Sequence, residues 1–86
     1  MLSNITYADV FLTILYKKDP YNRYYNKYEI GKSLLFKDSF TDEVVQYLLD
    51  NGLIKYPGES NSQSTKIVIT GRGRRSVEKS YFDLAF

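Results

Sequence analysis

Residues 45–54 read Val-Gln-Tyr-Leu-Leu-Asp-Asn-Gly-Leu-Ile, and within this stretch the helical spacing of apolar side chains gives way to a short apolar run. The Asn-Gly pair is a typical left-handed helix cap, and Leu53 is placed for the hydrophobic contact that often follows such a cap. The stretch therefore predicts the end of a helix that covers about residues 40–51, followed at once by a strand over residues 53–56.

Two further helices are expected before this stretch. The first covers residues 7–18 and ends before Asp19-Pro20, because the residue before a proline is pushed out of the helical region. Its apolar stripe consists of Tyr7, Val10, Phe11, Ile14 and Leu15. The second covers about residues 27–36, and the tyrosine-rich residues 20–26 are expected to form a polar connection. Its tyrosines are expected to pack on the core, and stacking on bases or on a partner is the alternative.

All three helices share one start signal, a capping oxygen three residues before a carboxylate. The pairs are Thr6 and Asp9, Asn26 and Glu29, and Ser39 and Asp42. This spacing lets both side chains bind free amide groups of the first helical turn, and the carboxylate also suits the positive end of the helix dipole.

The period of the pattern changes after the third helix. Residues 66–70 are mostly β-branched and predict the returning strand of a hairpin, whose tip is the polar loop over residues 57–64. A last helix is expected over about residues 72–84. The fold class is therefore mainly α with a small β-hairpin, an α+β class, in the order helix, helix, helix, hairpin, helix.

The composition excludes several classes of function. The 86 residues include no cysteine and no histidine, so disulfides, thiolate zinc sites and histidine-based catalysis are ruled out. No cofactor motif is present, and we expect a protein that is not an enzyme and carries neither cofactor nor metal. No apolar run is long enough to cross a membrane and no signal peptide is recognisable, so the cytoplasm is the expected location, without a membrane partner.

Charge is unevenly distributed along the chain, although the net charge is only +2. Residues 38–50 carry four acidic side chains and no basic one. Residues 1–37 and residues 51–86 each carry six basic and three acidic side chains. The acidic segment coincides with the third expected helix.

Two motifs resemble the winged helix-turn-helix superfamily, and most closely its small bacterial, phage and archaeal domains of the MarR-like and PadR-like kind. The first is the helix end within residues 45–54, similar to Leu-x-x-x-Gly-Leu-Ile. The second lies within residues 67–74, Ile-Val-Ile-Thr-Gly-Arg-Gly-Arg, and is similar to a hydrophobic residue followed by Thr-x-x-Gly-Arg. The resemblance covers about residues 6–80 and implies one winged-helix domain over residues 1–86, with its wing at about residues 53–70.

The resemblance implies a protein that binds double-stranded DNA, a small transcriptional regulator. The third helix would then enter the major groove, the loop over residues 57–66 would be the wing, and the start of the second helix would meet a phosphate. Lys27 and Lys32 are the basic residues of that second helix.

The residue types on the third helix suit this role only in part. Gln46 is a suitable base-reading side chain, and Thr41 and Tyr47 suit contacts with phosphate or a thymine methyl group. Phosphate contacts are expected from a basic cluster at the wing base, Lys66, Arg72, Arg74 and Arg75. A solvated helix start is the alternative interpretation of these arginines.

The acidic third helix supports a rival hypothesis, a winged-helix module that binds a protein. Its docking residues would be Asp42, Glu43 and Asp50, which would repel a polyanion. A homodimer is a further expectation, because the chain ends on the apolar side chains of Tyr81, Phe82, Leu84 and Phe86.

Overall fold

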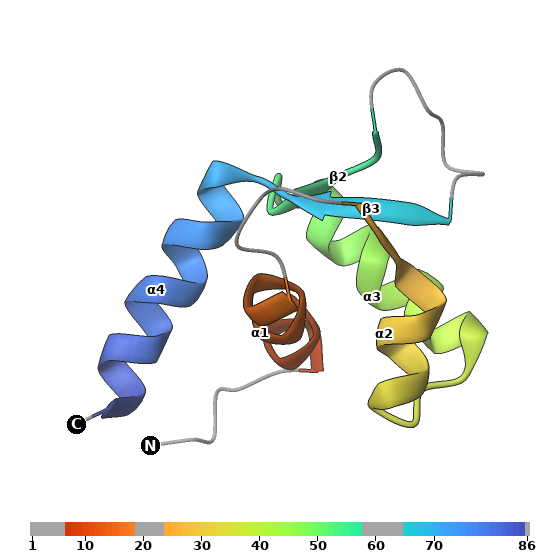
Figure 1. Ribbon diagram of the computed structural model, residues 1–86, viewed down its shortest axis with the longest axis horizontal. Coiled ribbons are helices and arrows are strands. Elements are labelled where there is room, and N and C mark those ends of the chain that lie inside the picture. The colour runs from red at the N-terminus through yellow and green to blue at the C-terminus, as the bar shows by residue number, and fades with distance from the viewer. Residues whose placement is uncertain (1–6, 19–23, 58–64, 86) are drawn as a thin grey trace.

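The computed structural model describes residues 7–18, 24–57 and 65–85, with side chains up to Lys79. Four helices and a small antiparallel sheet make up this part of the chain, which confirms the α+β class (Figure 1). The elements are α1 (Tyr7–Lys18), β1 (Tyr25–Asn26), α2 (Lys27–Ser33), α3 (Asp38–Asp50), β2 (Ile54–Lys55), β3 (Lys66–Ile69) and α4 (Gly71–Ala85).

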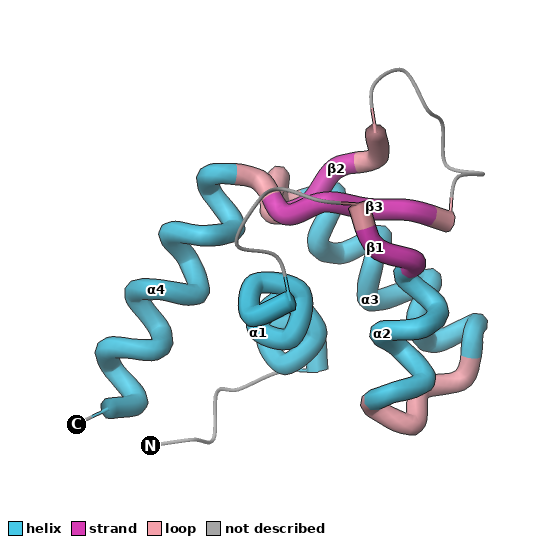
Figure 2. Tube along the Cα trace, viewed as in Figure 1, coloured by secondary structure: helices cyan, strands magenta, loops and turns pink. Residues whose placement is uncertain are grey.

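The sheet contains a strand that the sequence analysis missed. Its order is β1-β3-β2, so β1 pairs with the edge of β3 that the expected hairpin leaves open (Figure 2). Tyr25 lies opposite Ile67, while Ile54 lies opposite Ile69 on the other side. A two-residue strand is too short to show alternation, and its pairing partner is about forty positions away in the sequence, so a local pattern cannot reveal it.

The core forms around α1, which lies between α4 on one side and the pair α2 and α3 on the other (Figure 1). Its members include Phe11 and Leu15 of α1, Ile30 of α2, Leu48 of α3 and Ile67 of β3. Burial of these apolar side chains is the main stabilising contribution in a domain of this size.

The bounds of α1 match the prediction, but its buried face is turned relative to the expected stripe. Ala8 and Leu12 are buried together with Phe11 and Leu15, whereas the side chain of Tyr7 is 66% exposed. Tyr7 is the first residue of the helix and lies at the surface.

Helix α2 ends earlier than expected, at Ser33, because Leu35 adopts a left-handed conformation with φ of 64°. The N–H of Phe36 donates to the carbonyl of Gly31, and the N–H of Leu35 donates to that of Lys32. These two bonds form a Schellman cap, in which the left-handed position is usually glycine.

Of the three predicted helix starts, Asn26 is confirmed, because its side chain accepts a hydrogen bond from the N–H of Tyr28. The start at Ser39 is wrong, since α3 already begins at Asp38 and follows Lys37, whose side chain makes no capping bond. Thr6 lies outside the described residues.

The predicted cap after α3 is confirmed. Gly52 has φ of 70°, and the N–H groups of Gly52 and Leu53 donate to the carbonyls of Leu49 and Leu48. This second Schellman cap turns the chain directly into β2.

Thr70 joins that cap to the start of α4. Its hydroxyl donates to the carbonyl of Gly52 and accepts from the N–H of Gly73. Gly73 packs so closely that a Cβ there would lie 2.2 Å from the carbonyl oxygen of Leu53. This contact explains why a glycine stands within the first turn of a helix, where it is otherwise unfavourable.

Candidate functional site

Three basic side chains form a line along α4, which we call the α4 basic cluster. Arg72, Arg75 and Lys79 are exposed, and spacings of three and four residues place them on one side of the helix. They border a shallow hollow of about 340 Å³ together with Asn51, Leu53 and Ser76. Among the described residues, no acidic side chain lines this hollow, so a negatively charged group could approach it without repulsion from these residues.

Arg74 does not share this direction. It is half-buried and its guanidinium lies 5.9 Å from the ring centroid of Tyr16 on α1. The Tyr16 hydroxyl in turn donates to Glu78 at 3.0 Å, a hydrogen bond that raises the pKa of Tyr16. The predicted group of three arginines is therefore divided, and Lys79 joins the other two. The four-residue spacing between Arg75 and Lys79 is the sequence signal that places these two side chains on the same side of the helix.

The other expected basic residues lie in different settings. Lys66 is exposed at the start of β3, and Lys32 is exposed on α2. Lys27 is only 4% exposed, so the structure does not place it at a surface that could contact phosphate.

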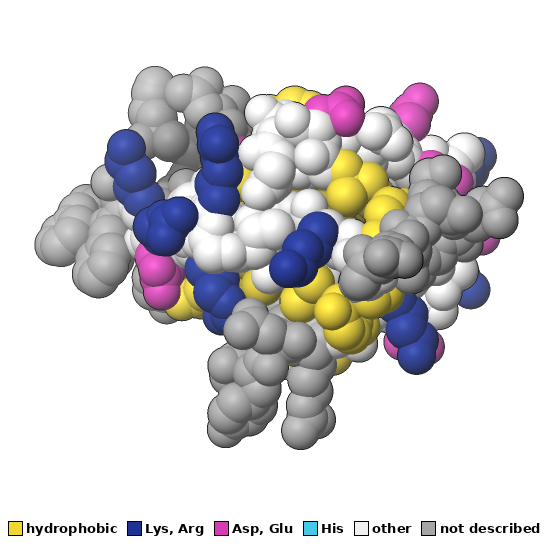
Figure 3. Space-filling view, turned by 90° about the horizontal axis from the view of Figure 1, so that it is seen from above, with side chains coloured by type: hydrophobic (Ala, Val, Ile, Leu, Met, Phe, Trp, Pro, Cys, Tyr) yellow, Lys and Arg dark blue, Asp and Glu magenta, His cyan; other side chains and the backbone are white. Residues whose placement is uncertain are grey.

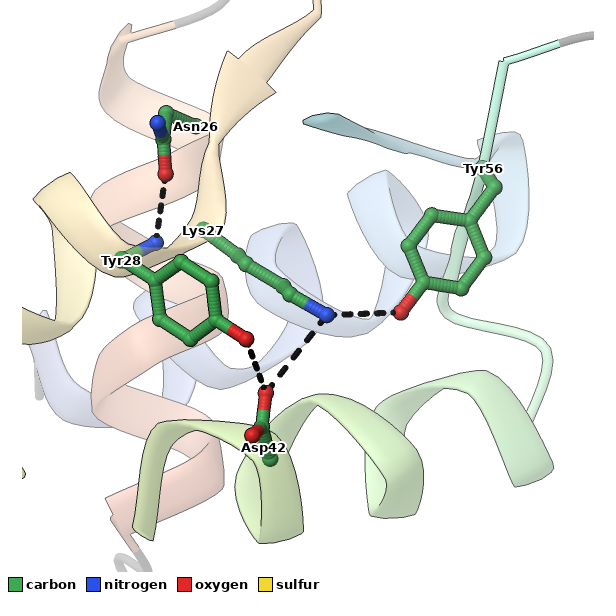
Figure 4. A network of polar contacts seen from close by, with 5 residues as sticks. All are labelled: Asn26, Lys27, Tyr28, Asp42 and Tyr56. Atoms are coloured by element: carbon green, nitrogen blue, oxygen red, sulfur yellow. Dashed lines mark hydrogen bonds and ion pairs between the residues drawn. The ribbon is translucent and has the colours of Figure 1, made fainter. Parts of the chain in front are cut away.

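Lys27 is the centre of a polar network that connects α2, α3 and the end of β2 (Figure 4). Its Nζ donates to the hydroxyl of Tyr56 at 3.0 Å and lies 3.5 Å from Oδ1 of Asp42. The hydroxyl of Tyr28 donates to the same Asp42 oxygen at 2.8 Å. Lys27 and Tyr28 therefore contact the Asp42 carboxylate from two sides, and Lys27 balances part of its negative charge.

The network also changes two pKa values. Burial lowers the pKa of Lys27, but the hydrogen bond from its ammonium group to Tyr56 and the nearby Tyr28 and Asp42 together outweigh burial and raise it. The hydrogen bond to Asp42 is the main cause that raises the pKa of Tyr28. Both shifts favour the protonated forms, which are the forms that the network needs.

The surface of α3 offers little to a nucleic acid base. Thr41 is fully buried. A Cβ on Gly31 would lie only 2.0 Å from its Oγ1, so Thr41 belongs to the packing of α2 on α3. Gln46 is exposed and its amide donates to Asp50 at 2.8 Å. Tyr47 is 54% exposed, and Glu43 is exposed beside it.

Basic side chains gather on the α4 side of the molecule when it is viewed from above (Figure 3). The four acidic residues of α3 are on a separate element, which carries no lysine or arginine. Among the described residues, no group of three or more acidic side chains could hold a metal ion. No described helix is long and apolar enough to cross a membrane.

The dimer contact at the end of the chain stays a prediction. Tyr81, Phe82 and Leu84 belong to α4, but their side chains, like all of Phe86, lie outside the described residues. No protein-family model matches the chain, and no curated protein or solved structure matches it either.

Proposed function

We propose that this chain is a winged helix-turn-helix domain that binds double-stranded DNA through phosphate contacts made by the α4 basic cluster. The order of elements supports the fold, because α2 and α3 are joined by a short turn and the hairpin of β2 and β3 follows α3 directly. A small transcriptional regulator is the role that this arrangement suits best.

The observation that carries the proposal is the alignment of Arg72, Arg75 and Lys79 beside a hollow whose described lining contains no acidic residue. Arginine and lysine side chains supply most of the phosphate contacts of DNA-binding proteins. The cluster also begins at the N-terminal end of α4, where the helix dipole adds a partial positive charge.

The surface of α3 limits base reading in this proposal. Gln46 and Tyr47 remain as candidate contacts, while Glu43 and Asp50 on the same helix would repel a polyanion. We therefore propose that phosphate contacts dominate binding and that sequence selectivity is low. Affinity should then depend steeply on salt, because each phosphate contact releases bound counterions.

The test is the fluorescence anisotropy of a labelled duplex, titrated from low to physiological salt. We expect Arg72→Gln and Arg75→Gln each to reduce the salt slope by about one, and the double variant by about two. Lys37→Gln is the matched control, since it removes the same charge from the turn between α2 and α3. If Lys37→Gln reduced the salt slope as much as Arg72→Gln or Arg75→Gln does, the assignment of the phosphate contacts to the α4 basic cluster would be contradicted. A duplex affinity that does not depend on salt would contradict it as well.

A further inference from the structure

A second surface, away from the α4 basic cluster, is aromatic and apolar. The rings of Tyr7, Phe36 and Phe40 meet edge to face, with centroid distances of 4.8–5.8 Å. A hollow of about 460 Å³ lies between Tyr7, Phe40 and residues 34–37. This hollow and a second one, which shares Tyr7 and Phe40 with it, are called the paired hollows.

The second of the paired hollows lies on the other side of Tyr7 and Phe40. It measures about 300 Å³, and its walls are almost entirely apolar. Its remaining lining residues are Ala8, Glu43, Val44 and Tyr47. The two hollows share Tyr7 and Phe40, so together they form one extended apolar surface across the start of α1 and along α3 as far as Tyr47.

Leu35 is the most informative residue of this surface. Its side chain is 93% exposed, and its backbone has the left-handed conformation that β-carbon sterics disfavour. A leucine here adds strain and buries almost nothing within the domain. An exposed apolar side chain held in a strained conformation is more readily explained by a bound partner than by folding.

The charge around the paired hollows indicates the chemistry of that partner. Glu43 lines one hollow, and Asp38 and Asp50 are exposed on the same helix. These three carboxylates form no ion pair within the described part of the chain, while Lys27 balances part of the charge of Asp42. Lys37 lines the first hollow, and α3 itself contributes no basic side chain.

We propose that the paired hollows bind a basic amphipathic helix of another protein, whose apolar side chains fill the hollows and whose lysines or arginines face α3. The segment of residues 1–6 does not fit this description, because it contains no lysine or arginine. A second copy is also a poorer fit, because Val77 is the apolar side chain in the described part of its basic helix α4, residues 71–79, and it is buried. Helix-in-groove binding with apolar anchors is an established mode of recognition.

The probe is a fluorescein-labelled 14-residue helix of leucine and lysine, and its counterpart of leucine and glutamate is the control peptide. We expect the lysine peptide to bind the full chain and the glutamate peptide to bind at least about tenfold more weakly. Leu35→Gly and Glu43→Lys should each weaken binding of the lysine peptide about tenfold, as expected for an anchor and a charge at an interface. Lys32→Glu is the matched charge control on α2 and should change this binding little.

Leu35→Gly is informative because it relieves backbone strain, so lost binding cannot be ascribed to lost folding. Equal binding of the two peptides, or unchanged affinity in Leu35→Gly, would overturn the proposal. Self-association that Leu35→Gly abolishes would assign the paired hollows to a second copy. Nuclear Overhauser contacts between residues 1–6 and Leu35 in the free protein would assign them to the chain itself. Either of these last two results would overturn the proposal of a basic helix from another protein.

Discussion

At the scale of single residues, Leu35 gives the most direct prediction. Glycine adopts its left-handed conformation without a steric penalty, and the leucine side chain makes little contact with the domain. We expect Leu35→Gly to raise the free energy of unfolding by about 1 kcal/mol, measured by urea denaturation.

The control for this prediction is Leu35→Ala, which removes the side chain but keeps the β-carbon. Its stability should remain within about 0.5 kcal/mol of the parent chain, because the backbone strain is unchanged. Equal stabilisation by alanine and glycine would show that the exposed side chain, and not the backbone, is the unfavourable feature.

Single residues also show what sequence reasoning can recognise. Gly52 and Asn26 were predicted as caps because a local motif determines their role. The burial of Thr41 and Lys27 was not predicted, because polar side chains are usually exposed and only the packing of α2 on α3 encloses these two. Two expected DNA contacts were lost from the candidate site for this reason.

At the scale of elements, Gly73 fixes how α4 begins against the end of α3. A β-carbon at this position would lie 2.2 Å from the Leu53 carbonyl and 2.8 Å from Ile69, so the helix would have to move. We expect Gly73→Ala to lower the free energy of unfolding by about 3 kcal/mol, as overpacking of a close contact does.

Gly71 provides the matched control within the same helical turn. A β-carbon there would lie 3.9 Å from the guanidinium of Arg75, an ordinary contact distance. Gly71→Ala should therefore leave the free energy of unfolding unchanged or raise it slightly. The melting temperatures of the Gly71→Ala and Gly73→Ala variants compare the two positions. If both substitutions lowered stability equally, the close contact with Leu53 would not be the cause, because alanine is otherwise the better helix former.

The elements themselves were predicted with unequal success. Helix α1 was placed correctly because Asp19-Pro20 is a recognised stop signal in the sequence and the apolar spacing before it is regular. The end of α2 was placed too late, since a left-handed leucine is not a recognised stop signal. Strand β1 was missed because it exists only through pairing with β3, a long-range contact that no local pattern encodes.

At the scale of the whole molecule, the raised pKa values of Lys27, Tyr28 and Tyr16 predict sensitivity to alkali. A group whose pKa is higher in the folded than in the unfolded chain stabilises the fold below its unfolded pKa. This contribution disappears as pH rises through the folded value. The ordinary values are 10.0 for tyrosine and 10.5 for lysine, so stability should fall above about pH 10.

Urea denaturation at pH 7, 9 and 10.5 measures this loss. Tyr28→Phe removes the hydroxyl that Asp42 stabilises in its protonated form, so the decline above pH 10 should become shallower. Tyr24→Phe changes an exposed tyrosine outside the network and should decline like the parent chain. A decline that begins well below pH 9 would point to other titrating groups.

The separation of the α4 basic cluster from the acidic helix α3 gives the molecule an electric dipole moment, although its net charge is only +2. In the field of a polyanion such a molecule experiences a torque as well as a weak attraction. It turns its α4 side forward while it is still at a distance of about one Debye length, roughly 10 Å at 0.1 M salt. In the proposed encounter with DNA, the orientation of the protein would therefore be selected before any side chain makes contact.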